Sequence, residues 1–450
     1  MAVLTAVAPE RETFIAPNPV RGATTIRKSV YAMSDVEVTA YRLAVYRLAQ
    51  ISEQAVHDQR GYQYVAGIHG LPGRFCKHHV AGFALWHRPY MQGYEQRLQD
   101  VVPGTFVPYW DWSTRRAQRE GIPQIFLDET WQNPDTNQEE ANPLLSQPTT
   151  LVRGGGGPTT RDPQGPSGLI ELRADLQTAL LAPDYNTFSP DLENPHDSVH
   201  GWVGGSMSNI GTAAYDPLFW SHHAFIEYAF CQWQDSHTEA QPPFMDPRDL
   251  APFSVTVEQI WNYEKLGYTY EPDNATELQI AGVSNGPGAA AGYTLRSGAT
   301  VASFPLHTVD PDEFHRAELR FENLTPPEDT FAVRVFADER GASAATPTNG
   351  NPHYLGTRYF FGHGECGGAE GHCDPVARDI YDLRPRHHYA PVRVRLNITK
   401  RLRALIRDSG GPQKAVGSGD APITLVVVDR DGNEVEDCGL HFEGLSVVIR

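Results

Sequence analysis

The chain has 450 residues, of which 40% are hydrophobic and 10% aromatic, and it carries a formal net charge of −18 from 55 acidic and 37 basic residues. This length predicts at least two domains. The charge disfavours nucleic acid, because a polyanionic backbone repels an acidic protein, and no apolar run is long enough to span a membrane. We therefore expect a soluble, folded protein that binds a small molecule; its oligomeric state is left open.

The first 33 residues are rich in Pro, Thr and Ala and have no periodicity, which predicts an extended N-terminal arm over residues 1–33. Basic residues occur in this stretch, but it lacks the apolar core of about seven to fifteen residues that a secretory signal has. We therefore expect a cytoplasmic protein, with export by another route left open.

Residues 34–270 carry the helical signals. Ser34 and Glu37 form a capping-box signature, and apolar residues follow at the 3.6-residue spacing of an amphipathic helix: Val38, Tyr41, Val45, Leu48, Ile51 and Ala55. Two further helices are predicted, from about Ala81 to Leu98 and from about Pro217 to Gln234, and together they indicate a bundle. Between these two, the prolines and glycines of residues 132–168 predict a long irregular excursion that can shape a site.

After residue 270 the composition changes. A stretch rich in Gly, Ala, Ser and Asn predicts a linker over residues 271–302, and strand-like runs follow it: Ala332–Ala337, Val392–Ile398, Ile423–Val428 and Leu445–Ile449. Asp431-Gly432 is a turn signal after the third of these runs. We therefore predict a C-terminal all-β, sandwich-like domain over residues 303–450.

Five cysteines are too few and too scattered for a scaffold built on disulfides. Cys366 and Cys373 lie with His363 and His372 in one glycine-rich loop. Three interpretations of this cluster stay open, in this order: a disulfide between the two cysteines, a zinc site, and a transient copper-loading site.

The histidines form two groups along the chain. In the second group, His196 and His200 stand four residues apart, which on a helix places both imidazoles on one face, where they can bind a single metal ion. Alone, such a pair is accidental about half the time. Downstream, Asp216–Trp220 leads into His222 and His223. Adjacent helix residues point about 100° apart, so we expect only one of these two to face the metal.

The first group consists of His69, His78 and His87, with His57 as a rival to His69. The nine residues between His78 and His87 would put them on opposite faces of one helix. We therefore expect His78 to lie before the helix or in its first turn, and only His87 to lie inside it.

The type of ligand limits which metal ions can bind. Imidazole suits copper, zinc, iron and nickel, and a set without thiolate or carboxylate argues against magnesium, calcium and structural zinc. Two groups of three histidines favour copper. Glu193 and Asp197 lie beside the second group, so a mononuclear non-haem iron site stays open as an alternative.

These stretches resemble the copper motifs of the type-3 copper family, which comprises tyrosinases, catechol oxidases and haemocyanins. Ala66–Pro72, Cys76-x-His78 and Trp86–Tyr90 resemble the first copper site, of fungal tyrosinases in particular. Asn194–His200 and Asp216–His223 are similar to the second site. Pro108–Trp112 matches a family motif between the sites, so the resemblance covers roughly residues 27–235.

The resemblance implies two copper ions per chain. One is bound by His69, His78 and His87, and the other by His196, His200 and His223. It also implies a mainly α four-helix bundle that holds the dicopper centre, with long irregular loops, within a catalytic domain of residues 34–270. The chain departs from the family after His223, where Phe225, Glu227 and Tyr228 stand in place of the common Asn, Asp and Arg.

Cys76 lies two residues before His78, the spacing at which fungal relatives carry a thioether between the cysteine sulfur and the histidine ring. The resemblance therefore implies a possible thioether bond, which would fix the orientation of the ligand. A buried thiol is the alternative interpretation.

In this family the copper pair activates O2, which oxidises phenolic substrates. Oxidation of a monophenol also requires removal of a phenol proton that titrates near 10, and hence a positioned base. Glu193 resembles the glutamate that holds a water in fungal tyrosinases, and Asp197 stands where many tyrosinases have Asn. Both could instead be acids that favour a helix N-terminus. Ile210 lies where plant catechol oxidases often have a bulky Phe, so it leaves more room.

We therefore expect a tyrosinase, or polyphenol oxidase, that hydroxylates monophenols and oxidises o-diphenols to o-quinones. A catechol oxidase limited to diphenols, or an o-aminophenol oxidase, is the alternative. A haemocyanin-like O2 carrier is the alternative of another class. The resemblance also implies that the β domain can cover the coppers and make the enzyme latent, with Tyr359-Phe360-Phe361 as the candidate plug.

Overall fold

The computed structural model describes residues 24–152, 154–170, 172–272, 291–296, 301–304, 311, 314, 316–364, 391–408, 421–435, 438, 440, 442 and 444–449. The chain divides into two compact units, residues 1–189 with 203–279 and residues 190–202 with 280–450. Helix α6 (Tyr185–Val203) begins and ends in the first unit, while its middle is grouped with the second. Cys366, His372 and Cys373 lie outside the described residues.

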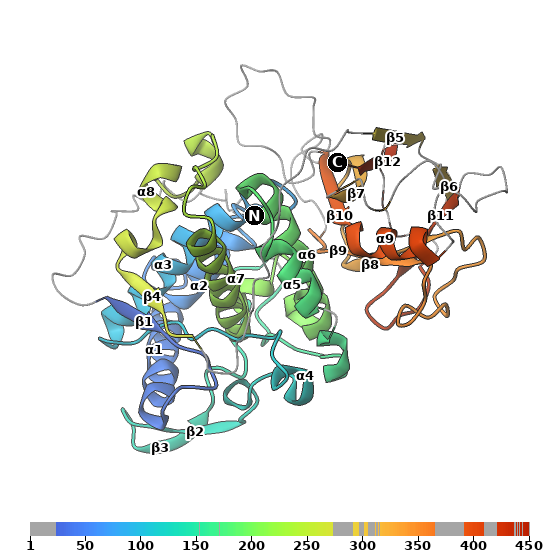
Figure 1. The fold of residues 1–450 in the computed structure, drawn as a ribbon. Coiled ribbons are helices and arrows are strands. Elements are labelled where there is room, and N and C mark those ends of the chain that lie inside the picture. Colours follow the sequence, from blue (N-terminus) through green and yellow to red (C-terminus); the bar gives the residue numbers. More distant parts are fainter. Residues whose placement is uncertain are drawn as a thin grey trace, which may run out of the picture. The chain divides into compact units, whose positions relative to one another are not determined.

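The first unit is built on helices, as predicted (Figure 1). α1 (Asp35–Gln54) starts at the expected capping box: the Ser34 amide donates to Glu37 Oε2 over 2.8 Å, and the Glu37 amide donates to Ser34 Oγ over 3.3 Å. Tyr41, Val45 and Leu48 of the predicted apolar stripe are fully buried. α1 packs against α2 (Tyr62–His69) and α3 (Phe83–Val101).

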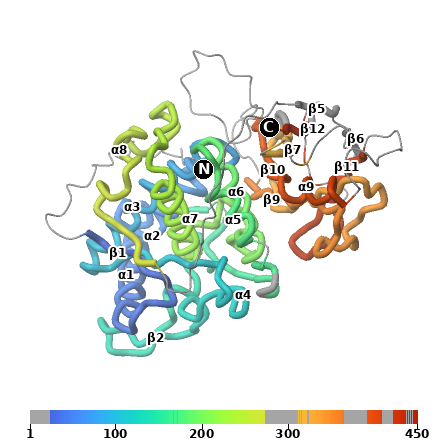
Figure 2. Tube along the Cα trace, in the orientation of Figure 1, coloured from blue at the N-terminus to red at the C-terminus, as the bar shows by residue number. Residues whose placement is uncertain are grey.

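α7 (Pro217–Ser236) packs against α3 in the same unit, and Figure 2 traces these helices beside each other. Asp216 caps α7, since its carboxylate accepts from the Leu218 amide over 2.9 Å, and Pro217 supplies a first helical residue that needs no hydrogen-bond acceptor. Trp220 of α7 stacks on Tyr94 of α3, with ring centroids 3.7 Å apart. The two predicted helices therefore exist within a few residues of their expected ends.

Short elements complete the first unit: α4 (Ala117–Glu120), α5 (Leu172–Leu180), α8 (Val257–Trp261), the parallel pair β1 (Thr25–Arg27) and β4 (Tyr268–Tyr270), and the hairpin β2 (Thr130–Asn133) with β3 (Gln138–Ala141). The hairpin lies in and beside the stretch predicted to be irregular. β1 belongs to the predicted N-terminal arm, so three of the arm's described residues, Thr25–Arg27, form a strand along β4.

The second unit contains two four-stranded antiparallel sheets among the described residues, ordered β10-β7-β12-β5 and β6-β11-β8-β9. Their bounds are β5 (Ala291–Arg296), β6 (Val301–Phe304), β7 (Ala317–Leu324), β8 (Phe331–Ala337), β9 (Tyr354–Phe360), β10 (Val392–Asn397), β11 (Ala421–Val428) and β12 (Gly444–Ile449), with helix α9 (Thr399–Asp408) between β10 and β11. The four predicted strands correspond to β8, β10, β11 and β12. β5 falls inside the predicted linker, where small residues leave little strand signal.

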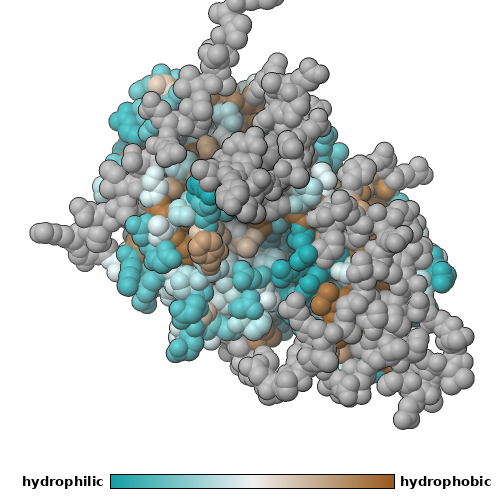
Figure 3. Space-filling model, turned by 90° about the horizontal axis from the view of Figure 1, so that it is seen from above, coloured by the Kyte–Doolittle hydropathy of each residue, from teal (hydrophilic) through white to brown (hydrophobic). Residues whose placement is uncertain are grey.

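The prediction of a helical part followed by a β part is confirmed, while the four-helix arrangement stays a prediction. Among the described helices, none combines the length and hydrophobicity that a membrane crossing requires. Among the coloured residues on the face drawn in Figure 3, hydrophilic and hydrophobic side chains are interspersed.

Candidate dicopper site

The first three histidines come from three different local structures in the first unit. His69 is the last residue of α2, His78 lies in the irregular segment before α3, and His87 is inside α3. All three are at least 95% buried. The expectation that His78 precedes the helix while His87 lies inside it is therefore correct. The Nε2 atoms of His69 and His78 face each other at 3.2 Å.

The position of His87 leaves one nitrogen for a metal. Its Nδ1 is 2.8 Å from the Phe83 carbonyl oxygen, which can only accept, so Nδ1 carries the proton and Nε2 keeps its lone pair. Burial lowers the pKa of His87 to about 3, which keeps the ring neutral. A ligand atom of His87 lies within 4.8 Å of those of His69 and His223.

The rival first ligand, His57, is exposed in a turn after α1, whereas His69 is fully buried in the histidine group. Close packing explains why a glycine, Gly70, directly follows His69. A Cβ on Gly70 would lie 2.5 Å from the Gly211 carbonyl oxygen, so only glycine lets the loop at 209–212 pack against the end of α2. Ile210 is buried in this loop.

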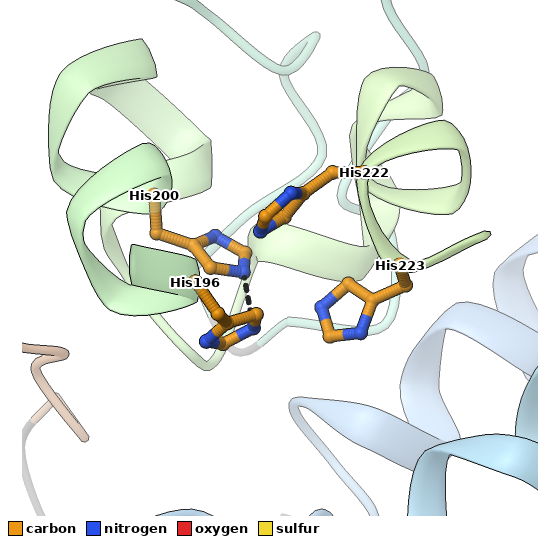
Figure 4. A group of neighbouring side chains, drawn as sticks. All are labelled: His196, His200, His222 and His223. Atoms are coloured by element: carbon orange, nitrogen blue, oxygen red, sulfur yellow. Dashed lines mark hydrogen bonds between the residues drawn. The ribbon is translucent and has the colours of Figure 1, made fainter. Parts of the chain in front are cut away.

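The second group lies on α6 and α7 (Figure 4). His196 and His200 are on one face of α6, as their spacing predicts, and their Nε2 atoms are 3.1 Å apart. Ligand atoms of His222 and His223 lie within 4.8 Å of this pair, and all four residues are fully buried. Both adjacent histidines therefore lie near the pair, and the expectation that only one of them faces the metal stays a prediction.

A hydrogen bond distinguishes the two neighbours. The Trp112 indole N–H donates to His222 Nδ1 over 3.1 Å. An indole has no acceptor, so Nδ1 of His222 is unprotonated and a neutral ring carries its proton on Nε2. His222 is thus held by Trp112, whereas His223 stacks on Phe219 with centroids 4.0 Å apart and on His87 at 4.5 Å.

The spacing of the facing nitrogens fits metal binding. Two imidazole nitrogens that each lie about 2.0 Å from one ion at a tetrahedral angle are about 3.3 Å apart. The pairs His69–His78 and His196–His200 have 3.2 Å and 3.1 Å between their Nε2 atoms. Buried imidazoles that converge twice in this way suit copper better than a hard cation. The residues present therefore fit two copper ions.

Two carboxylates lie on α6 beside the second group. Asp197 Oδ1 accepts from His196 Nδ1 over 3.0 Å, which directs His196 Nε2 away from the carboxylate. Glu193 is 1% exposed, and its carboxylate is within 4.8 Å of that of Asp197 and of a nitrogen of His79. Burial raises the pKa of Asp197 well above its usual value, the Glu193 charge adds to this, and Arg358 opposes it.

In the second unit, β9 and the residues that follow it contact the middle of α6. Phe361 stacks on His200, with centroids 4.3 Å apart and planes 16° apart, and it lies 6.2 Å from the ring of His196. Phe361 is fully buried. Phe360, the neighbouring residue of the predicted plug, instead packs against Phe331 and Phe321 within the second unit, here also called the β unit.

Cys76 lies close to the first group. Its Sγ is within 4.8 Å of a ring nitrogen of both His69 and His78. This position brings the sulfur next to the ring with which a thioether is predicted, and the bond itself stays a prediction.

Glu227 is one of the residues at which the chain departs from the family sequence. Its carboxylate is the acidic partner of an arginine on α3. Arg88, which follows His87, donates through Nε to Glu227 Oε1 over 2.9 Å, and both side chains are at most 1% exposed. Tyr268 donates to the same oxygen over 2.6 Å. Although burial opposes it, Glu227 raises the pKa of Arg88 above its usual value.

Sequence reasoning did not assign a role to His79, Trp112, His222 or Arg358. Trp112 was part of a recognised motif, yet its partner is 110 residues away in the chain. Arg358 lies on a strand that composition alone does not connect to α6. The only local signal was the pair of adjacent histidines.

The central domain common to tyrosinases matches residues 59–236 of this chain. The tyrosinase of Streptomyces lincolnensis is 31% identical over 206 residues, which span 41% of this chain and 75% of that protein. A G-type haemocyanin of Enteroctopus dofleini is 28% identical over 280 residues, which span 57% of this chain but only 9% of that protein.

Solved structures share the fold. A functional unit of octopus haemocyanin has a TM-score of 0.61 at 20% identity and covers 94% of this chain and 99% of its own. The tyrosinase of Burkholderia thailandensis, at low pH, also has a TM-score of 0.61, at 17% identity, with 93% and 99% covered. The fold and the histidine groups define a type-3 copper protein. Within this class, the chain belongs to the tyrosinase family.

Proposed function

We propose that the protein is a dicopper phenol oxidase of the tyrosinase kind, which hydroxylates monophenols and oxidises o-diphenols to o-quinones. The observation that carries this proposal is the pair of facing Nε2 atoms in each histidine group, 3.2 Å and 3.1 Å apart, on side chains that are at least 95% buried. His69, His78 and His87 hold one copper ion, and His196, His200 and His223 hold the other. α2, α3, α6 and α7 then form the four-helix bundle around them.

The copper pair, when bound, supplies the electrons that reduce O2. The protein's own residues orient the ligands and handle the phenol proton. Glu193 and Asp197 lie on the turn of α6 that carries His196, where a carboxylate or a water held by it accepts that proton. Ile210 leaves space for the phenol ring that a bulkier aromatic residue would occupy.

The alternative within the same class is an oxidase limited to o-diphenols or o-aminophenols, which needs no base for a phenol proton. The alternative of another class is an O2 carrier, which is favoured by the haemocyanins among the relatives. An enzyme is the better proposal because Glu193 and Asp197 supply two acids beside the second copper ligands.

The first test is to load the chain with copper and to measure metal content, O2 consumption and quinone formation with p-cresol and with 4-methylcatechol. We expect two coppers per chain and turnover of both substrates. Turnover of the catechol alone would establish the diphenol oxidase. Reversible O2 binding without turnover of either substrate would establish the carrier, and a single bound metal would refute the dicopper centre.

Replacing Glu193 by Gln tests the base. We expect p-cresol turnover to fall about 10²-fold, because general-base catalysis contributes about 10²- to 10⁴-fold to such a step. Turnover of 4-methylcatechol is expected to change much less, because its oxidation to the o-quinone adds no oxygen atom to the ring. Equal losses for both substrates would show that Glu193 supports the site as a whole rather than the proton transfer.

Replacing Phe361 by Ala tests the plug. We propose that Phe361, stacked on His200, keeps substrate from the site, so that its loss raises catechol turnover by about tenfold, the equivalent of about 1.4 kcal/mol of lost stacking. Phe360→Ala is the control: that ring packs inside the β unit, so its loss should lower the melting temperature without activating the enzyme. Unchanged turnover in Phe361→Ala would remove the plug from consideration.

A further inference from the structure

Among the described strands, β9 stands at the edge of its sheet, and a side chain of α6 bonds to its outer side. The Asn194 amide donates through Nδ2 to the Thr357 carbonyl over 3.3 Å, and the Tyr359 amide donates to Asn194 Oδ1 over 3.2 Å. One carboxamide thus bonds residues on either side of Arg358, as a neighbouring strand would. This contact fixes the register of β9 against α6.

Arg358, set in that register, reaches two residues of α6. Its Nη1 donates to Asn194 Oδ1 over 3.1 Å, and its Nη2 donates to Asp197 Oδ2 over 3.4 Å. The Arg358 and Asp197 side chains are 2% and 0% exposed, so water screens this ion pair little. The planar guanidinium suits two acceptors at fixed directions better than an ammonium does.

The same Asp197 carboxylate holds His196 through its other oxygen. Oδ1 accepts from His196 Nδ1 over 3.0 Å, while Oδ2 accepts from Arg358. A carboxylate bonded at both oxygens cannot rotate freely about its terminal bond. The plane of the His196 ring is therefore set by a strand more than 150 residues away in sequence, since Asp197 and Arg358 are 161 residues apart.

We propose that Arg358 is a positioning residue for the second metal ion: it acts through Asp197 to aim His196 Nε2 at the copper. This inference rests on the proposed assignment of His196 as a ligand. It gives the β unit a role besides covering the site, because β9 then supplies part of the outer shell that supports a ligand. Outer-shell partners of metal-binding histidines typically contribute about 10- to 100-fold to metal affinity.

Arg316 offers a matched control. It pairs with Asp191, also on α6, over 2.7 Å, and this pair is likewise mostly buried, with 16% and 4% of the side chains exposed. Asp191 is five residues from His196. Its described ion pair is with Arg316, and none of its described contacts is with a predicted ligand. Arg316→Met therefore removes an ion pair between the β strands and α6 but leaves the His196 support intact.

The experiment measures the affinity of each copper by chelator competition in the full chain, with circular dichroism and melting temperature as checks of folding. In Arg358→Met we expect the second copper to bind about 10- to 100-fold more weakly, and in Arg316→Met we expect both affinities to stay as in the unchanged chain. Arg358→Lys, which keeps the charge but not the fork, should recover part of the affinity. It also serves as the test variant if Arg358→Met does not fold.

Each outcome decides the inference. Equal copper affinities in the Arg358 and Arg316 variants, whether both normal or both weakened, would overturn it. A loss of affinity in Arg358→Lys as large as in Arg358→Met would show that a positive charge alone does not support His196 and that the planar fork of Arg358 is required. If the unchanged chain binds fewer than two coppers, the proposed function fails, which is a different result from failure of the Arg358 variants in a chain that binds two.

Discussion

Replacing His223 by Ala is expected to leave one copper per chain and to lower phenol oxidation by about 10³-fold or more, because a coupled pair cannot act with one ion missing. His223 stacks on His87 and Phe219 and has a ligand atom near both histidine groups. Metal analysis and catechol oxidation after copper loading measure the two effects.

His222 provides the control, because it lies next to His223 and is equally buried. In His222→Gln we expect two coppers to remain, since Nδ1 of His222 accepts from Trp112 and a neutral ring then carries its proton on Nε2, which leaves no lone pair for a metal. The melting temperature should fall, as the replacement accepts from the indole with poorer geometry. If His222→Gln loses a copper and His223→Ala does not, the assignment of these two residues is reversed.

Replacing Glu227 by Ala is expected to lower the free energy of unfolding by about 3–5 kcal/mol, because it leaves the Arg88 guanidinium buried without its carboxylate partner. The pair joins α3 to α7, with Arg88 next to His87 in the chain, and both side chains are at most 1% exposed. Urea unfolding of the chain, followed by circular dichroism, measures the effect.

A double replacement separates the lost partner from lost packing. Arg88→Met with Glu227→Leu removes both charges, so we expect it to be markedly more stable than Glu227→Ala alone. Glu120→Ala, which breaks the exposed pair between Arg116 and Glu120, should change stability far less. A small effect of Glu227→Ala, similar to that of Glu120→Ala, would show that water reaches Arg88.

Much of the helical part could be predicted from local sequence. The capping box at Ser34, the Pro217 start of α7 and the spacing of His196 and His200 are properties of one turn of helix, and a helix has the same period wherever it lies. The β strands with dense β-branched residues were also recognisable. β5 was not, because its glycine and alanine resemble a linker.

The sequence by itself determined the family, the helical and β parts and the spacing that places His196 and His200 on one helix face, because motif spacing and helix period are local. Only the tertiary structure decided which neighbour holds each ring: Trp112 on His222, Phe361 on His200, and Arg358 on the carboxylate that supports His196. Those partners are 110 to 161 residues apart in the chain. Contacts of that separation follow from how strands and helices pack, and no periodicity within a short segment carries that information.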